Sequence, residues 1–482
     1  MSLLSISFAI FFVAALALYQ LRPSFTWRQR VLALCNLVFV GSQAQGWGII
    51  PLATFVSIGY VGVCLVRYPR FRRALPLAIG AAVGAFVYLK QYEPFDLLPH
   101  LPVAYTVVGL SYVLFRILHL LIDTAEGAFP EGISPVDYFN YTCFLFCFPS
   151  GPIQRYESFD AMYRQPVIPQ LTPSQSYAAI SRAVNGLIKV ALVSLVLDNA
   201  QKALYGLADT AHGGSAWMLM CPCCLLYLVY LYANFSGYMD IVIGLATFFG
   251  FTLPENFNHP FAASGFLDLW ARWHITLSDW FRYYMFNPLV KMAKREWRDP
   301  RATIPIGVGA YTLTFLVMGL WHGSTPVFLW YGCMLGLGAG VNKCYDELMR
   351  KRLGKQGFRQ VQKHWAHQAF SNALTMGFFA VALMALWTRN GQLQALPIEL
   401  GTGGQGLFHL LMLIPACAAL YSLVKLPAAG LLLLYDRAMR SLRKVVEHPV
   451  SWQLGLGLRA CALFLTLSRT ATHLPGFVYK AF

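Results

Sequence analysis

Two histidines that directly follow tryptophans are the residues in this sequence best suited to do chemistry. His274 follows Trp273 in the segment LDLWARWHITLSDWFRYY, and His322 follows Trp321 in MGLWHGSTP. An imidazole can take up a proton near neutral pH, and its neighbours can fix which ring nitrogen does so. We therefore take His322 and His274 as candidate catalytic residues, with a packing histidine and an interfacial polar residue as their respective alternatives.

Other catalytic and metal-binding patterns offer no competing chemistry. The GxSxG, HExxH, P-loop and GxGxxG motifs do not occur in a suitable context in the sequence. The pair Cys143/Cys147 and the run Cys221-Pro-Cys223-Cys224 have spacings like those of metal sites, but no cysteine or histidine partner lies near them. We interpret these cysteines as small buried apolar residues, and we expect no metal.

The composition indicates a protein that crosses a membrane many times. Of its 482 residues, 57% are hydrophobic and 12% are charged, whereas soluble proteins carry about 25% charged residues. Many apolar runs reach the ~20 residues that cross a bilayer as a helix, and lipid excludes exposed irregular backbone. The predicted fold class is therefore an all-α polytopic membrane protein with about 11–12 transmembrane helices plus short or re-entrant helices.

The expected spans follow the apolar runs. They lie at about 4–20, 31–47, 50–66, 74–89, 103–121, 180–199, 216–250, 303–321, 327–342, 369–387, 406–424 and 453–470. The first apolar run has neither a basic start nor a cleavage signal, so we expect it to remain as a span. The apolar segment 137–149 is too short to cross a bilayer, which predicts a re-entrant or half-buried helix.

Basic loops set the expected orientation. The net charge is +16, and the basic residues cluster in short loops such as LRPSFTWRQR and RYPRFRR. Such clusters act as orientation signals and as contacts to anionic lipid. Their alternation along the chain predicts that both termini lie on the outer, periplasmic side of the membrane, and we expect membrane lipids rather than nucleic acid as partners.

Polar residues interrupt one of the expected spans. Asn234, Ser236, Gly237, Tyr238 and Asp240 lie within 216–250 and predict a broken span. Ionisable Asp240 is a candidate functional residue, and a structural hydrogen-bond acceptor for a nearby Tyr, Trp or Arg is the favoured alternative.

The segment 267–284 lies in the cytoplasmic stretch 255–301 and predicts one interfacial helix. The apolar face of that helix combines three tryptophans with Leu277, while Asp268, Arg272 and Asp279 lie elsewhere on it.

Several segments resemble the membrane-bound O-acyltransferase (MBOAT) family. PENFNHPF, FLDLWARWHITLSDWFRYYMFNPL and MGLWHG are similar to its signature segments, and the bacterial alginate O-acetylation branch is the most similar. FPSGPIQRYESF (148–159) and FSGYMDIVIGLATFFGF (235–251) also resemble that branch, so the similarity covers about 104–345. The branch commonly has two basic residues before the WH pair and a PLGG turn after it. This chain has Ala271-Arg272 and NPLVK there.

The resemblance implies a single integral membrane domain over 1–482 with a central tunnel. Its catalytic core covers about 104–345, and 1–103 and 346–482 supply further helices. By resemblance His322 is the catalytic histidine and His274 the second signature position. The remaining residues implied to bind substrate or support the site are Trp321, Trp273, Asp240, Asp268, Arg272, Asn256 and Ser278.

The implied activity is transfer of an acyl group, acetyl above all, from a cytoplasmic thioester to a hydroxyl. The donor would be acetyl-CoA or an acylated carrier protein, with no permanently bound cofactor. The basic runs 289–301 and 343–365 would meet that anionic donor or serve as topology signals. The acceptor would be a secreted polysaccharide or a periplasmic partner, which places the chain in a bacterial inner membrane. A periplasmic acetyltransferase and polysaccharide-synthase subunits are the implied partners. D-alanyl transfer toward teichoic acid and a non-catalytic acyl-group transporter are the alternatives.

Overall fold

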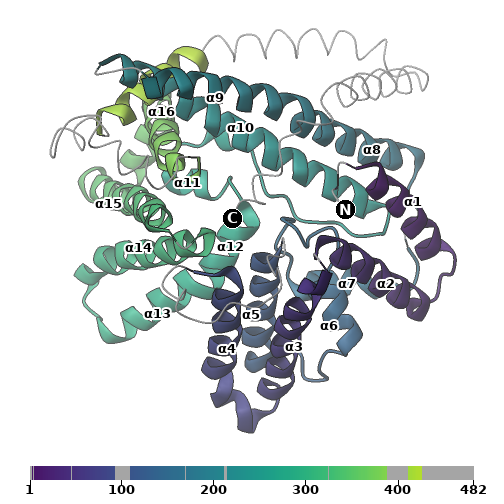
Figure 1. Ribbon diagram of the computed structural model, residues 1–482. Helices are drawn as coiled ribbons and strands as arrows, with labels where there is room; N and C mark the ends of the chain where they lie inside the picture. Colours follow the sequence, from purple (N-terminus) through teal and green to yellow (C-terminus); the bar gives the residue numbers. More distant parts are fainter. Residues whose placement is uncertain are drawn as a thin grey trace. The chain divides into compact units, whose positions relative to one another are not determined.

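The computed structural model describes Leu3 and residues 5–44, 46–92, 109–168, 170–210, 214–323, 325–387 and 411–425. Within these ranges the regular structure is helical, apart from one isolated β-bridge between Phe257 and Trp273. The α-helices are α1 Ile6–Gln20, α2 Phe25–Gln43, α3 Ile49–Val66, α4 Leu75–Lys90, α5 Leu110–Glu126, α6 Pro135–Thr142, α7 Tyr156–Tyr163, α8 Pro173–Ile188, α9 Ser194–Thr210, α10 Gly214–Thr247, α11 Phe266–Trp270, α12 Ile275–Phe281, α13 Asn287–Glu296, α14 Thr303–His322, α15 Pro326–Lys363 and α16 Trp365–Ala382 (Figure 1). A further helix covers Leu411–Lys425.

Shorter helical segments join several of these helices. The 3₁₀ segments are Gly46–Gly48, Pro69–Ala74, Pro260–Ala262, Pro300–Ala302 and Leu383–Leu386, and the π-helical turns are Lys189–Val193 and Arg282–Phe286.

Within the described ranges, six helical segments are long and apolar enough to cross a membrane, which confirms an all-α polytopic membrane protein. They are Gly46–Val66, Pro69–Lys90, Pro173–Asp209, Met218–Thr247, Pro300–His322 and Trp365–Leu386. Two shorter apolar helices, α1 and Leu411–Lys425, coincide with further predicted spans. The predicted span at 453–470 lies outside the described residues, so the count of about twelve spans stays a prediction.

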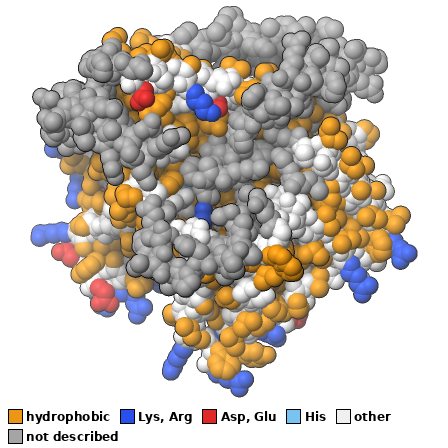
Figure 2. Space-filling model, in the orientation of Figure 1, with side chains coloured by type: hydrophobic (Ala, Val, Ile, Leu, Met, Phe, Trp, Pro, Cys, Tyr) orange, Lys and Arg blue, Asp and Glu red, His pale blue; other side chains and the backbone are white. Residues whose placement is uncertain are grey.

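The surface has the character expected of a lipid-facing frame. Ile6 of α1 is 81% exposed, Leu77 of α4 is 77% exposed and Phe370 of α16 is 71% exposed. Figure 2 shows many hydrophobic side chains on the surface with few charged side chains among them. In water such exposure would cost free energy, and against lipid tails it does not.

The chain divides into two compact units. Among the described residues, one unit consists of those up to Leu187 together with Tyr238–Glu255, and the other of Ile188–Gly237 together with those from Asn256 to Lys425. Whether the whole chain behaves as one domain stays a prediction.

In the first unit, α3, α4 and α5 pack against one another (Figure 1). Helix α5 is buried on nearly all sides, although it carries Arg116, His119 and Asp123. Each of these polar groups has a partner: Arg116 Nη1 donates to the Tyr141 carbonyl at 3.0 Å, and His119 Nδ1 lies 3.2 Å from an Asp123 carboxylate oxygen. Buried polar side chains in this helix therefore satisfy backbone and side-chain groups around it.

The short apolar segment predicted at 137–149 is buried, but only its first part is helical. Ser134 caps the start of helix α6, because its hydroxyl accepts from the Asp137 amide at 3.1 Å, and the helix ends at Thr142. Buried turns follow, and Asn36 Oδ1 accepts from the amide of Leu145 at 2.9 Å. Side chains from neighbouring elements thus supply the hydrogen bonds that irregular buried backbone needs.

The predicted break in the span at 216–250 is wrong, because α10 is helical from Gly214 to Thr247. Its polar side chains bond to other helices instead of competing for α10's own backbone groups. The Asn234 amide donates to the Ser194 hydroxyl at 3.4 Å, and Asp240 accepts from Arg182 at 3.0 Å. A single glycine inside a helix costs only about 1 kcal/mol, and the cost of Gly237 is too small to end α10.

In the second unit, α14 and α15 form a tight hairpin built on glycines. A Cβ placed at Gly332 of α15 would lie 2.6 Å from the Phe315 carbonyl oxygen of α14, and one at Gly319 would lie 2.9 Å from the Gly332 Cα. The two helix backbones therefore touch without intervening side chains, as small residues allow between membrane helices.

We expect Gly332→Leu to destabilise the protein by about 1–3 kcal/mol, because the new side chain must push α14 away from α15. The measurement is the thermal unfolding midpoint of purified protein in detergent. Gly309→Leu on α14 is the control, because nothing lies within 4 Å of a Cβ at Gly309. Equal midpoints for the two variants would contradict the glycine packing.

Candidate active site

His322 is the last residue of α14 and is buried, with 4% of its surface exposed. Its ring lies 4.6 Å from the Trp321 ring and 5.5 Å from the ring of Tyr331, which returns from α15. Gly323 follows in extended conformation, and a Cβ at this position would overlap the Phe328 ring. The glycine therefore lets the chain turn closely against α15 while the imidazole stays in the interior.

His274 lies in a turn between two short helices, so the prediction of one continuous helix over 267–284 is wrong. Helix α11 ends at Trp270 and α12 begins at Ile275. His274 itself has φ 48° and ψ 51°, the left-handed conformation, which costs a non-glycine residue about 1–2 kcal/mol. The surrounding hydrogen bonds hold it there.

Asn256 supplies several of those hydrogen bonds. Its backbone carbonyl accepts from the Ile275 amide at 3.0 Å. Its side-chain oxygen accepts from the Thr276 amide at 3.1 Å and from the Thr276 hydroxyl at 2.7 Å. Asn256 and Thr276 are both buried. The Asn256 side chain therefore caps the start of α12 and fixes the direction in which His274 leaves the chain.

Ser278 and Trp273 complete this turn. The Ser278 hydroxyl lies 3.2 Å from the carbonyls of both Trp273 and His274. This α12 side chain therefore hydrogen-bonds to the backbone of the turn. The Trp273 ring packs 5.2 Å from Phe257 and 5.1 Å from Phe379, and the His274 ring packs 4.8 Å from Phe235.

The pKa of His274 depends on its burial and on the charge of His322. His274 lies outside the candidate spans, and burial lowers its pKa well below the usual value. A positive charge on His322 lowers that pKa further, and the backbone carbonyl of His274 opposes the shift. His274 is therefore neutral at pH 7. Its neutral ring has one nitrogen that accepts and one that donates a hydrogen bond.

Asp268 and Arg272 pair with each other at 2.8 Å, and each side chain is about one-third exposed. Asp268 also accepts from the Ser264 amide at 2.8 Å. These contacts fix the loop before α11, and a role of the pair in supporting the site stays a prediction.

Asp240 belongs to the first unit, whereas both histidines belong to the second. Arg182 of α8 donates to Asp240 at 3.0 Å and binds Glu255 through two hydrogen bonds of 2.7 and 2.6 Å. This geometry fits the structural interpretation of Asp240, and its role in substrate binding stays a prediction.

Sequence reasoning missed three side chains that shape this arrangement. Phe235 and Tyr331 pack on the two imidazoles, and Arg182 joins two carboxylates. Tyr331 could have been found, because a tight glycine-rich hairpin brings the first turns of α15 back to the end of α14. Phe235 and Arg182 come from distant segments and left no local signal.

Comparisons with known proteins identify the family of the chain. Residues 102–362, more than half of the chain, match the membrane-bound O-acyltransferase (MBOAT) family. The chain therefore belongs to the MBOAT family, as the resemblance predicted.

Three relatives illustrate the range of this match. The chain is 30% identical over 262 residues to teichoic acid D-alanyltransferase of Bacillus subtilis, covering 54% of this chain and 62% of that protein. It is 28% identical over 284 residues to the probable alginate O-acetylase AlgI of Azotobacter vinelandii, covering 58% and 52%. It is 38% identical over 136 residues to peptidoglycan O-acetyltransferase of Helicobacter pylori, covering 28% and 24%. The aligned part thus spans less than two thirds of each of these three relatives.

The left-handed conformation at position 274 leads to a test that separates backbone from imidazole. We expect His274→Gly and His274→Asn to be more stable than His274→Ala by about 1 kcal/mol, because Gly and Asn tolerate positive φ. Thermal unfolding in detergent measures the order of the three variants. If the alanine variant matched the other two, the turn would not have the described conformation.

Asn256→Ala removes the acceptor for two buried donors of Thr276, so we expect it to cost about 1–3 kcal/mol. Asn258→Ala is the matched control, because Asn258 is exposed and bonds through its backbone amide to the Arg272 carbonyl. Chemical unfolding of the two variants in mild detergent gives the comparison. Equal loss in both would show that the Asn256 side chain does not hold the turn.

Proposed function

We propose that this protein transfers an acetyl group from a thioester donor to a hydroxyl, with His322 as the general base. The observation that carries this proposal is the buried pair of imidazoles, His322 at the end of α14 and His274 in its left-handed turn. Burial favours the neutral ring, and a neutral ring is the form that can accept a proton.

The proposed reaction needs no covalent enzyme intermediate, because a thioester is already activated. The acceptor oxygen attacks the thioester carbonyl while His322 takes the hydroxyl proton. The tetrahedral intermediate then collapses, the carbon–sulfur bond breaks, and the departing thiolate receives the proton from His322. General base catalysis of this kind contributes roughly 10²–10⁴-fold to the rate.

Hydrogen-bond donors near His322 would stabilise the oxyanion of that intermediate. The Trp321 indole N–H and the second imidazole both belong to the segments that surround His322, whereas the Gly323 amide already donates to the Gly319 carbonyl at 3.3 Å. Donors fixed in place before the reaction contribute most in a buried site. We assign this role to Trp321 and His274.

The proposed acceptor is a hydroxyl of a secreted polysaccharide or of a periplasmic partner protein in the bacterial cell envelope. Relatives named as alginate O-acetylase and peptidoglycan O-acetyltransferase support a polysaccharide acceptor. A tunnel would have to bring the acceptor and a cytoplasmic donor to the same imidazole. Helix α13 exposes Lys291, Lys294 and Arg295, which could meet an anionic CoA or carrier protein.

D-alanyl transfer toward teichoic acid is a second candidate, supported by the 30% identity to the Bacillus subtilis enzyme over 54% of the chain. The departures from the alginate branch at Ala271 and at NPLVK leave room for it. Supplying purified protein with acetyl-CoA, acetyl-carrier protein or D-alanyl-carrier protein separates the two candidates by which donor is consumed.

His322→Ala should lower acetyl transfer by about 100-fold or more, because the hydroxyl loses its base. The protein should remain in the membrane. The measurement is acetyl incorporation into polysaccharide by membranes that contain equal amounts of each variant. His364→Ala is the control, because His364 is exposed at the end of α15.

Acetylation that survives in His322→Ala would refute the proposed base. Movement of acyl groups across the membrane that persists in the variant without any acetylated product would favour the transporter alternative.

A further inference from the structure

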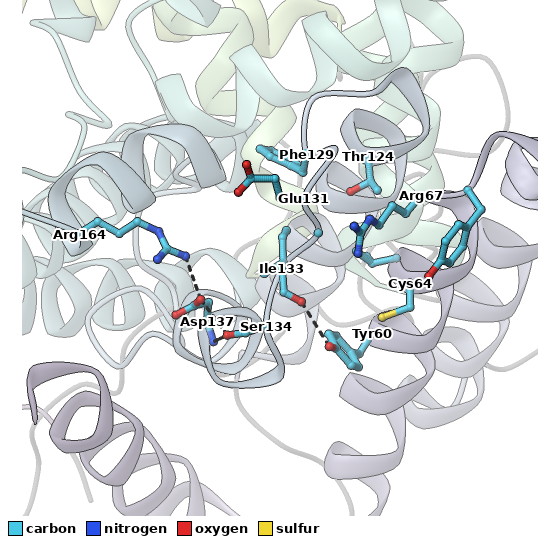
Figure 3. Close-up of a pocket in the computed structure, with 13 residues that line it drawn as sticks. Tyr60, Cys64, Arg67, Thr124, Phe129, Glu131, Ile133, Ser134, Asp137 and Arg164 are labelled. Atoms are coloured by element: carbon cyan, nitrogen blue, oxygen red, sulfur yellow. Dashed lines mark hydrogen bonds and ion pairs between the residues drawn. The ribbon is translucent and has the colours of Figure 1, made fainter. Parts of the chain in front are cut away.

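A cavity of about 410 Å³ lies in the first unit, at the end of α3. It is lined by the last turn of α3 with Arg67 and Tyr68, the end of α5 with Thr124, the loop 129–134 and the start of α6 (Figure 3). Its volume falls in the range of small-molecule sites. Neither histidine of the candidate active site lines it, so the acyl-transfer proposal does not use it.

Arg67 provides an uncompensated positive charge in this cavity. Its Nε donates to the Pro130 carbonyl at 3.0 Å, and no carboxylate of the described ranges forms a salt bridge with it. Gly132 has φ 81°, and a Cβ at that position would overlap the Arg67 guanidinium. The glycine therefore lets the loop pass directly against the guanidinium, whose two outer nitrogens are left to bind a ligand.

Thr124 provides a buried hydroxyl with no partner in the protein. Thr124 is 2% exposed, and its Oγ1 makes no hydrogen bond to any described group. The residue lines the cavity, and Figure 3 shows its side chain on the same side as Arg67. An unsatisfied buried hydroxyl costs about 1–3 kcal/mol, so a ligand that accepts a hydrogen bond from this hydroxyl would relieve that cost.

The carboxylates of the cavity do not cancel the charge of Arg67. Asp137 is occupied by Arg164 at 2.9 Å, by the Ser134 hydroxyl at 2.7 Å and by Gln29 at 2.7 Å. Glu131 is exposed, and in Figure 3 its carboxylate points away from Arg67. The next segment, Pro69–Ala74, adds three further arginines. The local field is therefore positive and favours an anion.

We propose that this cavity binds the phosphate group of an anionic membrane lipid. Arg67 would bind two phosphate oxygens with its guanidinium, and the Thr124 hydroxyl would donate to a third. The site lies at the end of a membrane span, where headgroups are found, and basic pockets between spanning helices bind such headgroups. Tyr68 and Phe71 are 49% and 39% exposed beside it, as aromatic residues at the membrane interface often are.

The test measures binding of phosphatidylglycerol and phosphatidylcholine to the purified full-length protein by native mass spectrometry and by thermal shift. Three variants are compared: Arg67→Gln, Thr124→Val and Arg70→Gln. Arg70 is the matched control because it lies in the same basic segment but contacts the Tyr68 and Phe71 rings and does not line the cavity. Soluble glycerol phosphate is the second ligand, which presents the same phosphate without a membrane anchor.

Wild-type protein should bind phosphatidylglycerol in preference to phosphatidylcholine. Arg67→Gln and Thr124→Val should each weaken phosphatidylglycerol binding by about tenfold or more, as expected for hydrogen bonds to a charged group. Arg70→Gln should weaken it by about fivefold or less, the effect of one surface charge. Without lipid, Thr124→Val should unfold at the same temperature as wild type or higher, because it removes a hydroxyl that has no protein partner.

Equal effects of Arg67→Gln and Arg70→Gln, with none of Thr124→Val, would overturn the site in favour of general surface attraction. A response to glycerol phosphate that depends on Arg67 and Thr124, without one to phosphatidylglycerol, would retain the phosphate site and overturn lipid as its source. Absence of any preference for phosphatidylglycerol or glycerol phosphate would overturn the proposal entirely.

Discussion

Burying a polar group without a partner costs several kcal/mol, and this constraint governs both units of the protein. Lipid offers no hydrogen bonds to replace those lost from water. The chain therefore carries many of its buried polar groups in partnered sets. Arg116 serves carbonyls at the end of α6, Arg182 joins Asp240 and Glu255, and Asn256 serves the first turn of α12. The apolar residues are left to face the membrane.

The same constraint explains the chemistry of the candidate site. A buried imidazole is held neutral by its surroundings, and a second imidazole nearby makes protonation less favourable still. The His274 imidazole can thus accept a proton at neutral pH. The left-handed backbone of His274 is strained, and the hydrogen bonds of Asn256 and Ser278 offset that strain.

Much of the frame could be predicted from the sequence, because hydrophobic runs and basic loops report directly on lipid and water. The apolar runs at 303–321 and 327–342, on either side of His322, and the short buried segment near α6 were predicted in this way. The turn at His274 could not be, since LDLWARWHITLSDW has a helical pattern and the hydrogen bonds that break it come from Asn256. The polar run from Asn234 to Asp240 misled in the opposite sense, because its partners lie on Ser194 and Arg182, which no local pattern shows.

The backbone contact between α14 and α15 also limits how the site can be regulated. Helices joined at Gly319 and Gly332 without side chains between them cannot slide or rotate past one another without a steric clash. His322 and Tyr331 are thus carried on one rigid hairpin, and their mutual distance is not an adjustable variable. A rearrangement that reaches His322 must therefore carry Tyr331 along with it.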